Sequence, residues 1–153
     1  MKKLCIMLVA VCLGASLFSC AYPGNAETKG AEYAYLAVLE MFWYKDSLIV
    51  ADLAGANIEN KEAVYNLMED FCRGKDTSFL RYQDYETADI PYSTEIEVVL
   101  LSFKDNRLTK SKLVTEVAKT WPQHHNEGYG ILIIVKKQND EWTVSKTKTT
   151  WIS

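Results

Sequence analysis

Cysteine is scarce in the part of the chain that can form a domain. The sequence has four cysteines in 153 residues, but Cys5 and Cys12 lie in an apolar leading segment that Cys20 ends. Cys72 is therefore the one cysteine left, and a single thiol excludes an intramolecular disulfide framework. We expect a domain stabilised by packing, with Cys72 in its core. The alternatives for Cys72 are a reactive thiol and a disulfide to another chain.

Histidine is also scarce, and the common catalytic motifs are absent. His124 and His125 are the two histidines, and Glu127 follows them. This trio could supply metal ligands or a general base, but adjacent side chains need not converge, so we expect an exposed loop with no metal or other cofactor. No zinc-helix spacing, nucleophile elbow or phosphate loop is present. These absences favour a binding or interaction domain over an enzyme.

The sequence also lacks a convincing membrane span. A transmembrane helix needs about 20 apolar residues, whereas the longest mostly apolar run covers residues 4–18. That run follows Lys2 and Lys3 and ends in small residues, which is the pattern of a secretory signal peptide. We therefore expect residues 1–19 to be a signal peptide that is removed from the mature chain.

The end of this run, Leu17-Phe18-Ser19-Cys20, resembles the bacterial lipobox, in which a Leu three residues before a Cys marks the peptidase site. The resemblance implies a diacylated, palmitate-bearing Cys20 that anchors the chain in a membrane. Many lipoproteins retained at the inner membrane have Asp after the Cys, but Ala21 stands here, and no acidic cluster follows. We expect a cell-envelope protein at the outer membrane, facing the periplasm.

Signal removal makes the chain more acidic. The sequence has 17 basic and 20 acidic residues, and the loss of Lys2 and Lys3 leaves 15 against 20. An acidic, exported chain does not fit nucleic-acid binding. The charge is uneven, because residues 21–103 hold 6 basic and 15 acidic residues and residues 104–153 hold 9 and 5. This indicates two solvated faces of one domain or, alternatively, a basic C-terminal surface for an anionic partner.

The first half of the mature chain predicts helices. Residues 20–28 contain Pro, Gly and Asn and read as a tether, so residues 29–153 are the expected single domain. Helices are predicted over residues 29–45, 48–54 and about 60–73. The third carries a helical repeat and a cap at Asn57 or Asn60; its apolar face comprises Val64, Leu67, Met68 and Phe71.

The second half predicts a sheet. Residues 75–93 read as a long loop with a short strand near Phe79. Strands are predicted over residues 94–103, 108–121, 129–135 and 142–151, with turns at Lys104–Asn106 and at Gln138–Asp140. The order gives an α+β domain, with N-terminal helices packed on a curved antiparallel sheet of about four to five strands.

This order is similar to the cone-shaped fold of nuclear transport factor 2 and the SnoaL-like proteins, often grouped as cystatin-like. The residues that carry the resemblance are the closing hairpin, Gly-Tyr-Gly-Ile-Leu-Ile-Ile-Val over 128–135 followed by Asn-Asp-Glu-Trp over 139–142. The resemblance implies a helix inside a curved sheet and, in enzymes of the family, an Asp or His at the open end. The fold hosts enzymes, binders and scaffolds, so it does not fix function.

Two groups of residues are candidate sites. Asp46 either caps the helix predicted over 48–54 or lies in a small-ligand pocket lined by Tyr35, Phe42 and Trp43. In the alternative of a periplasmic hydrolase, isomerase or dehydratase, Asp46 or His124 would act in that pocket. The second group, in the long loop, either folds onto the core or forms a lip for an envelope protein; it comprises Tyr82, Tyr85 and Tyr92.

Overall fold

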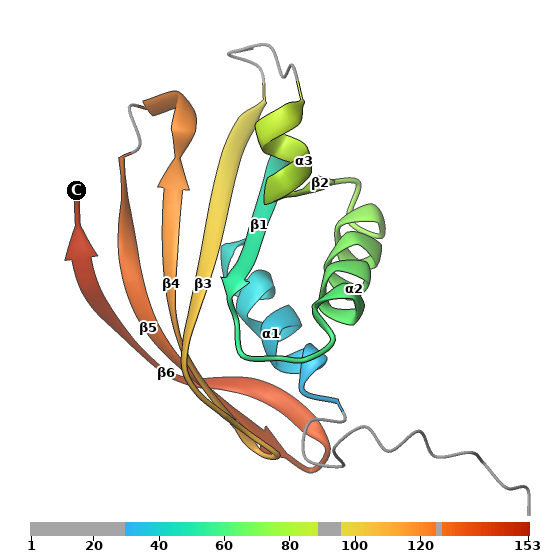
Figure 1. Cartoon of the computed structure of the whole chain (residues 1–153), viewed down its shortest axis with the longest axis vertical. Coiled ribbons are helices and arrows are strands. Elements are labelled where there is room, and N and C mark those ends of the chain that lie inside the picture. The colour runs from blue at the N-terminus through green and yellow to red at the C-terminus, as the bar shows by residue number, and fades with distance from the viewer. Residues whose placement is uncertain (1–29, 89–95, 125–126) are drawn as a thin grey trace, which may run out of the picture.

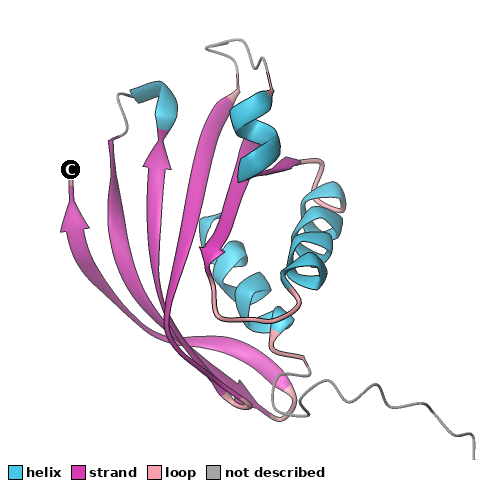
Figure 2. Ribbon diagram, in the orientation of Figure 1, coloured by secondary structure: helices cyan, strands magenta, loops and turns pink. Residues whose placement is uncertain are grey.

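A six-stranded sheet curves around α1 in the computed structural model, which describes residues 30–88, 96–124 and 127–153 (Figure 1). The predicted α+β class is confirmed: three helices alternate with the first three strands, and three further strands follow (Figure 2). The elements are α1 (Glu32–Phe42), β1 (Ser47–Gly55), α2 (Lys61–Arg73), β2 (Ser78–Arg81), α3 (Tyr82–Thr87), β3 (Glu97–Thr109), β4 (Lys112–Trp121), a 3-10 turn (Pro122–His124), β5 (Glu127–Gln138) and β6 (Glu141–Ile152).

The sheet is mixed, which differs from the predicted antiparallel sheet of four to five strands. Its order is β2-β1-β3-β4-β5-β6, and β1 runs parallel to both of its neighbours. Residues 48–54, predicted as a helix, form most of β1. The run is apolar on both faces, because Ile49 packs on the helix side and Val50 packs on the other. A short, doubly buried run carries no periodicity that separates a helix from a strand.

The two long helices lie on the concave face of the sheet. The helix predicted over residues 29–45 forms over Glu32–Phe42, and its Tyr35, Val38, Leu39 and Phe42 side chains are buried. The opposite side of α1 is not enclosed, since Tyr33 is 49% exposed and Met41 is 41% exposed. In α2, the Asn60 side chain caps the helix by accepting from the Ala63 N–H at 3.1 Å, as predicted.

Of the two turns predicted from the sequence, one is absent and one is confirmed. Lys104–Asn106 is not a turn, because β3 continues through it with a bulge between Asp105 and Arg107. Polar residues at a bulge resemble a turn in sequence, and the chain reverses instead between Thr109 and Lys112. The tight turn before β6 is confirmed, with Asn139 and Asp140 at φ of 50° and 64°.

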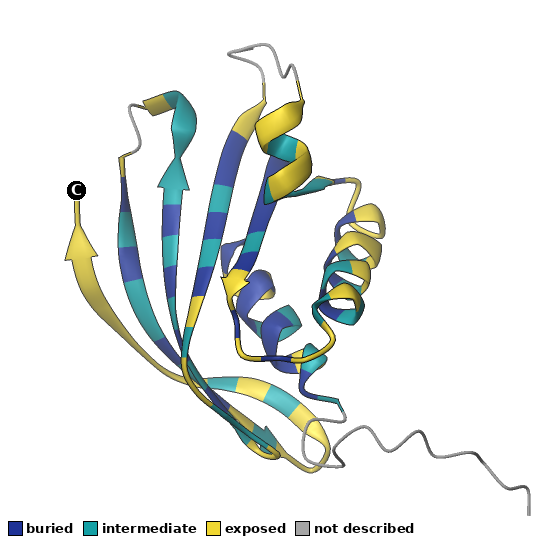
Figure 3. Ribbon diagram, in the orientation of Figure 1, coloured by how far each residue is buried: buried dark blue, intermediate teal, exposed yellow. Residues whose placement is uncertain are grey.

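The segment predicted as a long loop is partly ordered. It contains β2, which extends the sheet beside β1, and α3, which lies on the convex face. Its rings pack against a small cluster of Leu48, Val50 and Val98. At the other end of the sheet, β6 is an exposed edge strand, as its Thr and Lys content predicts (Figure 3).

Candidate functional site

The residues predicted to line a pocket around Asp46 lie in different environments. Tyr35 and Phe42 are core side chains, and the Trp43 indole N–H donates to Thr77 Oγ1 at 2.8 Å. Asp46 is exposed and has a φ of 62° in the turn between α1 and β1. It caps no second helix, because β1 occupies that part of the chain. A ligand role for these four residues therefore stays a prediction.

Tyr35 is held by a residue that the sequence did not single out. Its hydroxyl donates to Asp105 Oδ2, which also accepts from the Asn57 backbone N–H at 2.8 Å. Burial, and then the Asp105 carboxylate, raise the pKa of Tyr35 far above its ordinary value. The pair joins α1, the β3 bulge and the segment after β1, so we assign it to stability.

A buried lysine is the most unusual feature of the concave face. Lys119 on β4 is 9% exposed, and four rings surround its ammonium group. The distances from Lys119 Nζ to the ring centroids are 4.7 Å for Trp121, 5.5 Å for Tyr44, 5.9 Å for Phe42 and 6.0 Å for Tyr129. These five residues are called the lysine–aromatic cluster below.

Strand register and the end of α1 assemble this cluster. Lys119 pairs with Tyr129 on β5 and Trp121 follows two positions later on β4, so the three side chains share the concave face. Phe42 ends α1 and Tyr44 follows it. One member of the cluster can be found from the sequence alone. Lys119 continues the alternating row of Leu113, Thr115 and Val117, whose side chains face the core. A lysine at a core-facing position needs nearby groups that offset the free-energy cost of burying its charge.

The rings provide part of that compensation. Burial lowers the pKa of the Lys119 ammonium group, and the charge of Glu97 acts in the opposite direction. The negative faces of aromatic rings attract a cation within about 6 Å, and the attraction grows when water is excluded. The rings and the Glu97 charge therefore offset part of the cost of burying the Lys119 ammonium group.

Replacing Lys119 with Met is expected to stabilise the fold by about 1–2 kcal/mol at pH 7, because it removes a poorly compensated buried charge. The folded pKa lies below the unfolded one, so the unfolded chain binds more protons and stability rises with pH between the two values. The advantage of Lys119→Met should shrink as the pH rises towards about 10. Urea unfolding from pH 6 to pH 10 measures this; a constant difference would contradict it.

Two polar atoms of the cluster lack hydrogen bonds. The Tyr44 hydroxyl and Trp121 Nε1 are buried, and neither has a partner among the described residues. Burial and the Glu97 carboxylate raise the pKa of the Tyr44 phenol, and the Trp121 indole N–H acts in the opposite direction. Glu97 and Trp121 therefore both lie near the Tyr44 hydroxyl, although neither forms a hydrogen bond of ordinary geometry with it. Buried donors without an acceptor are rare in folded proteins. Both donors lie beside the Lys119 ammonium group.

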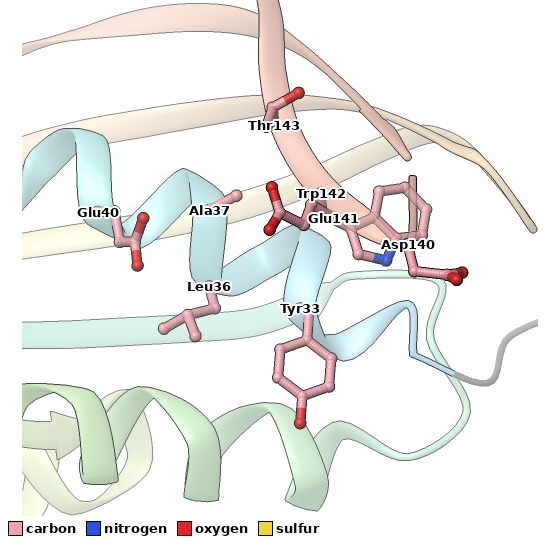
Figure 4. A pocket seen from close by; sticks show the side chains of 8 residues that line it. All are labelled: Tyr33, Leu36, Ala37, Glu40, Asp140, Glu141, Trp142 and Thr143. Carbon is pink, nitrogen blue, oxygen red and sulfur yellow. The ribbon is translucent and has the colours of Figure 1, made fainter. Parts of the chain in front are cut away.

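A separate hollow of about 280 Å³ lies between α1 and the turn that joins β5 to β6 (Figure 4). It carries the acids Glu40, Asp140 and Glu141 together with Tyr33 and Trp142. The Asp140 side chain is almost fully exposed and contacts Lys137 at 3.3 Å. The hollow is therefore open to solvent, and its acids are not fixed around a common point.

The remaining predicted site residues are dispersed. His124 is exposed in the 3-10 turn, and Tyr82 and Tyr85 are half-buried on α3. Cys20, Tyr92 and His125 lie outside the described residues. Within the described ranges, no group of three or more His, Cys, Asp or Glu side chains is placed to hold a metal ion.

Cys72 is fully buried, and burial raises the pKa of its thiol to about 11. We expect the folded protein to react with an aromatic disulfide reagent at pH 8 at least a hundredfold more slowly than the urea-unfolded chain, because thiolate and access are both lacking. The release of the coloured thiolate measures the rate. Rapid reaction of the folded protein would restore the reactive-thiol alternative.

Comparison with known proteins gives no assignment: no family model, curated protein or solved structure matches the chain. The similarity to the nuclear transport factor 2 cone therefore rests on the closing hairpin and on the predicted element order, from which β1 departs, and it stays a prediction. Among the described helices, none is both long and apolar enough to cross a bilayer.

Proposed function

We propose that this chain is an exported, lipid-anchored binding protein whose domain takes up a small ligand at the lysine–aromatic cluster. One observation carries the choice of site: a buried ammonium group within four rings lies beside two buried donors that form no hydrogen bond of ordinary geometry. A buried donor without a good hydrogen bond lowers the stability of the fold. A site that keeps such donors therefore suits a ligand that supplies the acceptor.

The donor set defines the ligand chemistry. Lys119, Tyr44 and Trp121 all present hydrogens, so the ligand needs a carboxylate, sulfonate or similar acceptor. A negative charge on the ligand would also offset the buried ammonium charge. The rings favour an apolar or aromatic body next to that group. The proposed ligand is a small amphiphilic anion.

Anilinonaphthalene sulfonate, an aromatic anion, is a suitable probe of the cluster. Titration of the folded protein should raise the probe's fluorescence with saturation at a single site. Lys119→Met should weaken binding at least tenfold, because the ammonium group that meets the sulfonate is removed while the apolar volume is retained. A melting curve of each variant establishes that the fold is intact.

Lys75→Met is the matched control, since Lys75 is an exposed lysine that lies near two rings, Trp43 and Phe71, outside the cluster. It should leave probe binding unchanged. If Lys119→Met binds the probe as the wild type does, or if Lys75→Met abolishes binding, the cluster is not the anion site and the proposal fails.

The anchor is tested separately. We propose that Cys20 carries palmitate and holds the domain at the outer membrane, facing the periplasm, on the support of Lys2, Lys3 and the Leu17–Cys20 segment. Labelling cells with a palmitate analogue should mark the wild type and not Cys20→Ser. The wild type should fractionate with membranes and resist added protease until the outer membrane is opened. An unlabelled, soluble wild type would contradict the anchor.

We do not extend the proposal to catalysis. A general acid or base at Asp46 or His124 needs a second polar group within hydrogen-bonding reach. Both residues are exposed, and neither makes a hydrogen bond or ion pair to another residue in the ranges that the structure describes. No placement of these side chains therefore favours the hydrolase, isomerase or dehydratase alternative.

A further inference from the structure

The convex face of β3–β6 is strongly basic. Strand alternation sends the apolar row of each strand to the concave core, which places the intervening residues on the opposite face. α3 covers β1 and only the start of β3, where its rings meet Val98, and it leaves the rest of this face open. Its basic residues come from all four strands: Lys104, Arg107, Lys112, Lys136, Lys146 and Lys148.

Most of the positive charge of this face lacks an acidic neighbour among the described residues. Lys112 lies directly opposite Lys136, an arrangement that destabilises a sheet when both residues are charged. Glu116 lies directly opposite Lys104 and can offset one of the six charges, and its carboxylate also accepts from the Thr150 hydroxyl at 2.6 Å. No ion pair joins any of the six cations to a described carboxylate. An anionic partner would relieve the repulsion between these cations, so the face suits such a partner.

The face also carries the apolar groups of an interfacial surface. Val114, Leu132 and Ile134 are half-buried between the cations, and Trp151 is 37% exposed where it lies over Gly130. Figure 3 shows β6, which bears two of the lysines, exposed over most of its length; Trp142 and Val144 near its start are half-buried. Tryptophan, and lysine on an apolar surface, are the residues that suit the boundary between lipid headgroups and water.

The start of the domain lies at the basic end of the sheet. A Cβ at Gly30 would lie 4.0 Å from Lys137 Nζ, so the chain enters α1 beside the β5–β6 hairpin. The segment from Cys20 to residue 29 spans at most about 35 Å when fully extended. A lipid on Cys20 would therefore keep the basic face within reach of the membrane that holds the anchor.

We propose that the convex face of β3–β6 lies against an anionic phospholipid surface, which gives the chain a second attachment beside its lipid. This inference rests on the proposed anchor. A layer of mobile phosphate headgroups matches six cations spread over four strands better than one compact anion does. Stable attachment of a lipidated protein commonly combines an acyl anchor with a basic patch.

The test uses the mature chain with Cys20→Ser, so that the face binds without the acyl chain. The buried core comes wholly from residues 31–135, so this variant retains the described fold. It should sediment with vesicles of equal parts phosphatidylglycerol and phosphatidylcholine at low ionic strength. It should not sediment with phosphatidylcholine alone, and about 0.5 M salt should release it, because salt screens exposed charges.

Charge reversal locates the surface. Lys146→Glu with Lys148→Glu should weaken vesicle binding at least tenfold. The matched control is Lys45→Glu with Lys61→Glu, which makes the same charge change away from this face; Lys61 opens α2, where Glu suits the helix dipole. Equal losses in the two pairs, or binding to both kinds of vesicle alike, would overturn the proposal. So would binding to soluble polyphosphate without binding to vesicles. Palmitate labelling of the wild type reports on the anchor independently of these results.

Discussion

Asp105→Ala is expected to lower the free energy of unfolding by about 3–5 kcal/mol. The carboxylate accepts hydrogen bonds from the fully buried Tyr35 hydroxyl and from the Asn57 N–H, and alanine leaves both donors without it. Hydrogen bonds to a charged group contribute about 1.5–3 kcal/mol each, and a buried unpaired donor adds its desolvation cost. Urea denaturation with the wild type as reference measures the loss.

Two further variants separate the contribution of the Tyr35 bond to Asp105 from that of the Asn57 bond and from changes in the bulge itself. Tyr35→Phe removes one donor and leaves the Asn57 contact, so its cost should be about 1–2 kcal/mol. Asn106→Ala, at the exposed neighbouring position in the same bulge, should be nearly neutral. If Asp105→Ala costs no more than Asn106→Ala, the bond to Tyr35 does not stabilise the fold.

Replacing Tyr82 and Tyr85 together with Ser is expected to cost about 2–4 kcal/mol. Both rings are half-buried and pack from α3 onto the convex cluster of Leu48, Val50 and Val98. Removal of two partly buried aromatic rings forfeits that apolar contact. Thermal unfolding followed by circular dichroism measures the change, and Gln83→Ser, exposed on the same helix, is the control.

The outcome also bears on the prediction that these tyrosines form a lip for a partner. A large loss of stability would identify the rings as packing residues first. An unchanged melting temperature, combined with loss of binding to an envelope partner, would support the lip. Tyr92, the third residue of that prediction, lies outside the described residues.

Local signals in the sequence were sufficient for some elements. The helix over Lys61–Arg73 follows from the spacing of Val64 and Met68 and from the cap at Asn60. Such signals lie within a few residues of one another, so no tertiary contact is needed to read them. The final hairpin is similar, because the Gln138–Asp140 turn fixes the register of its two strands.

Elements that depend on distant partners were not predictable in the same way. Residues 48–54 become a strand because β2 and β3 flank them, and neither partner is visible in the local pattern. Asp105 resembles a turn residue until Tyr35 is known to meet it. Lys119 could be noticed as an inward lysine, but its rings come from the end of α1, from β4 and from β5, and only the fold brings them together.

The parallel pairing of β1 with β3 sets an order of assembly. Ile49 pairs with Val99, so β1 has no inner neighbour until about fifty further residues have been made. The buried side chains of α1 are covered later still, because they also pack against side chains of β4 and β5. Contacts between such distant segments slow folding. A nascent or incomplete chain therefore exposes the apolar side of its first helix. It stays a substrate for chaperones and proteases until its last strands have been synthesised and have joined the sheet.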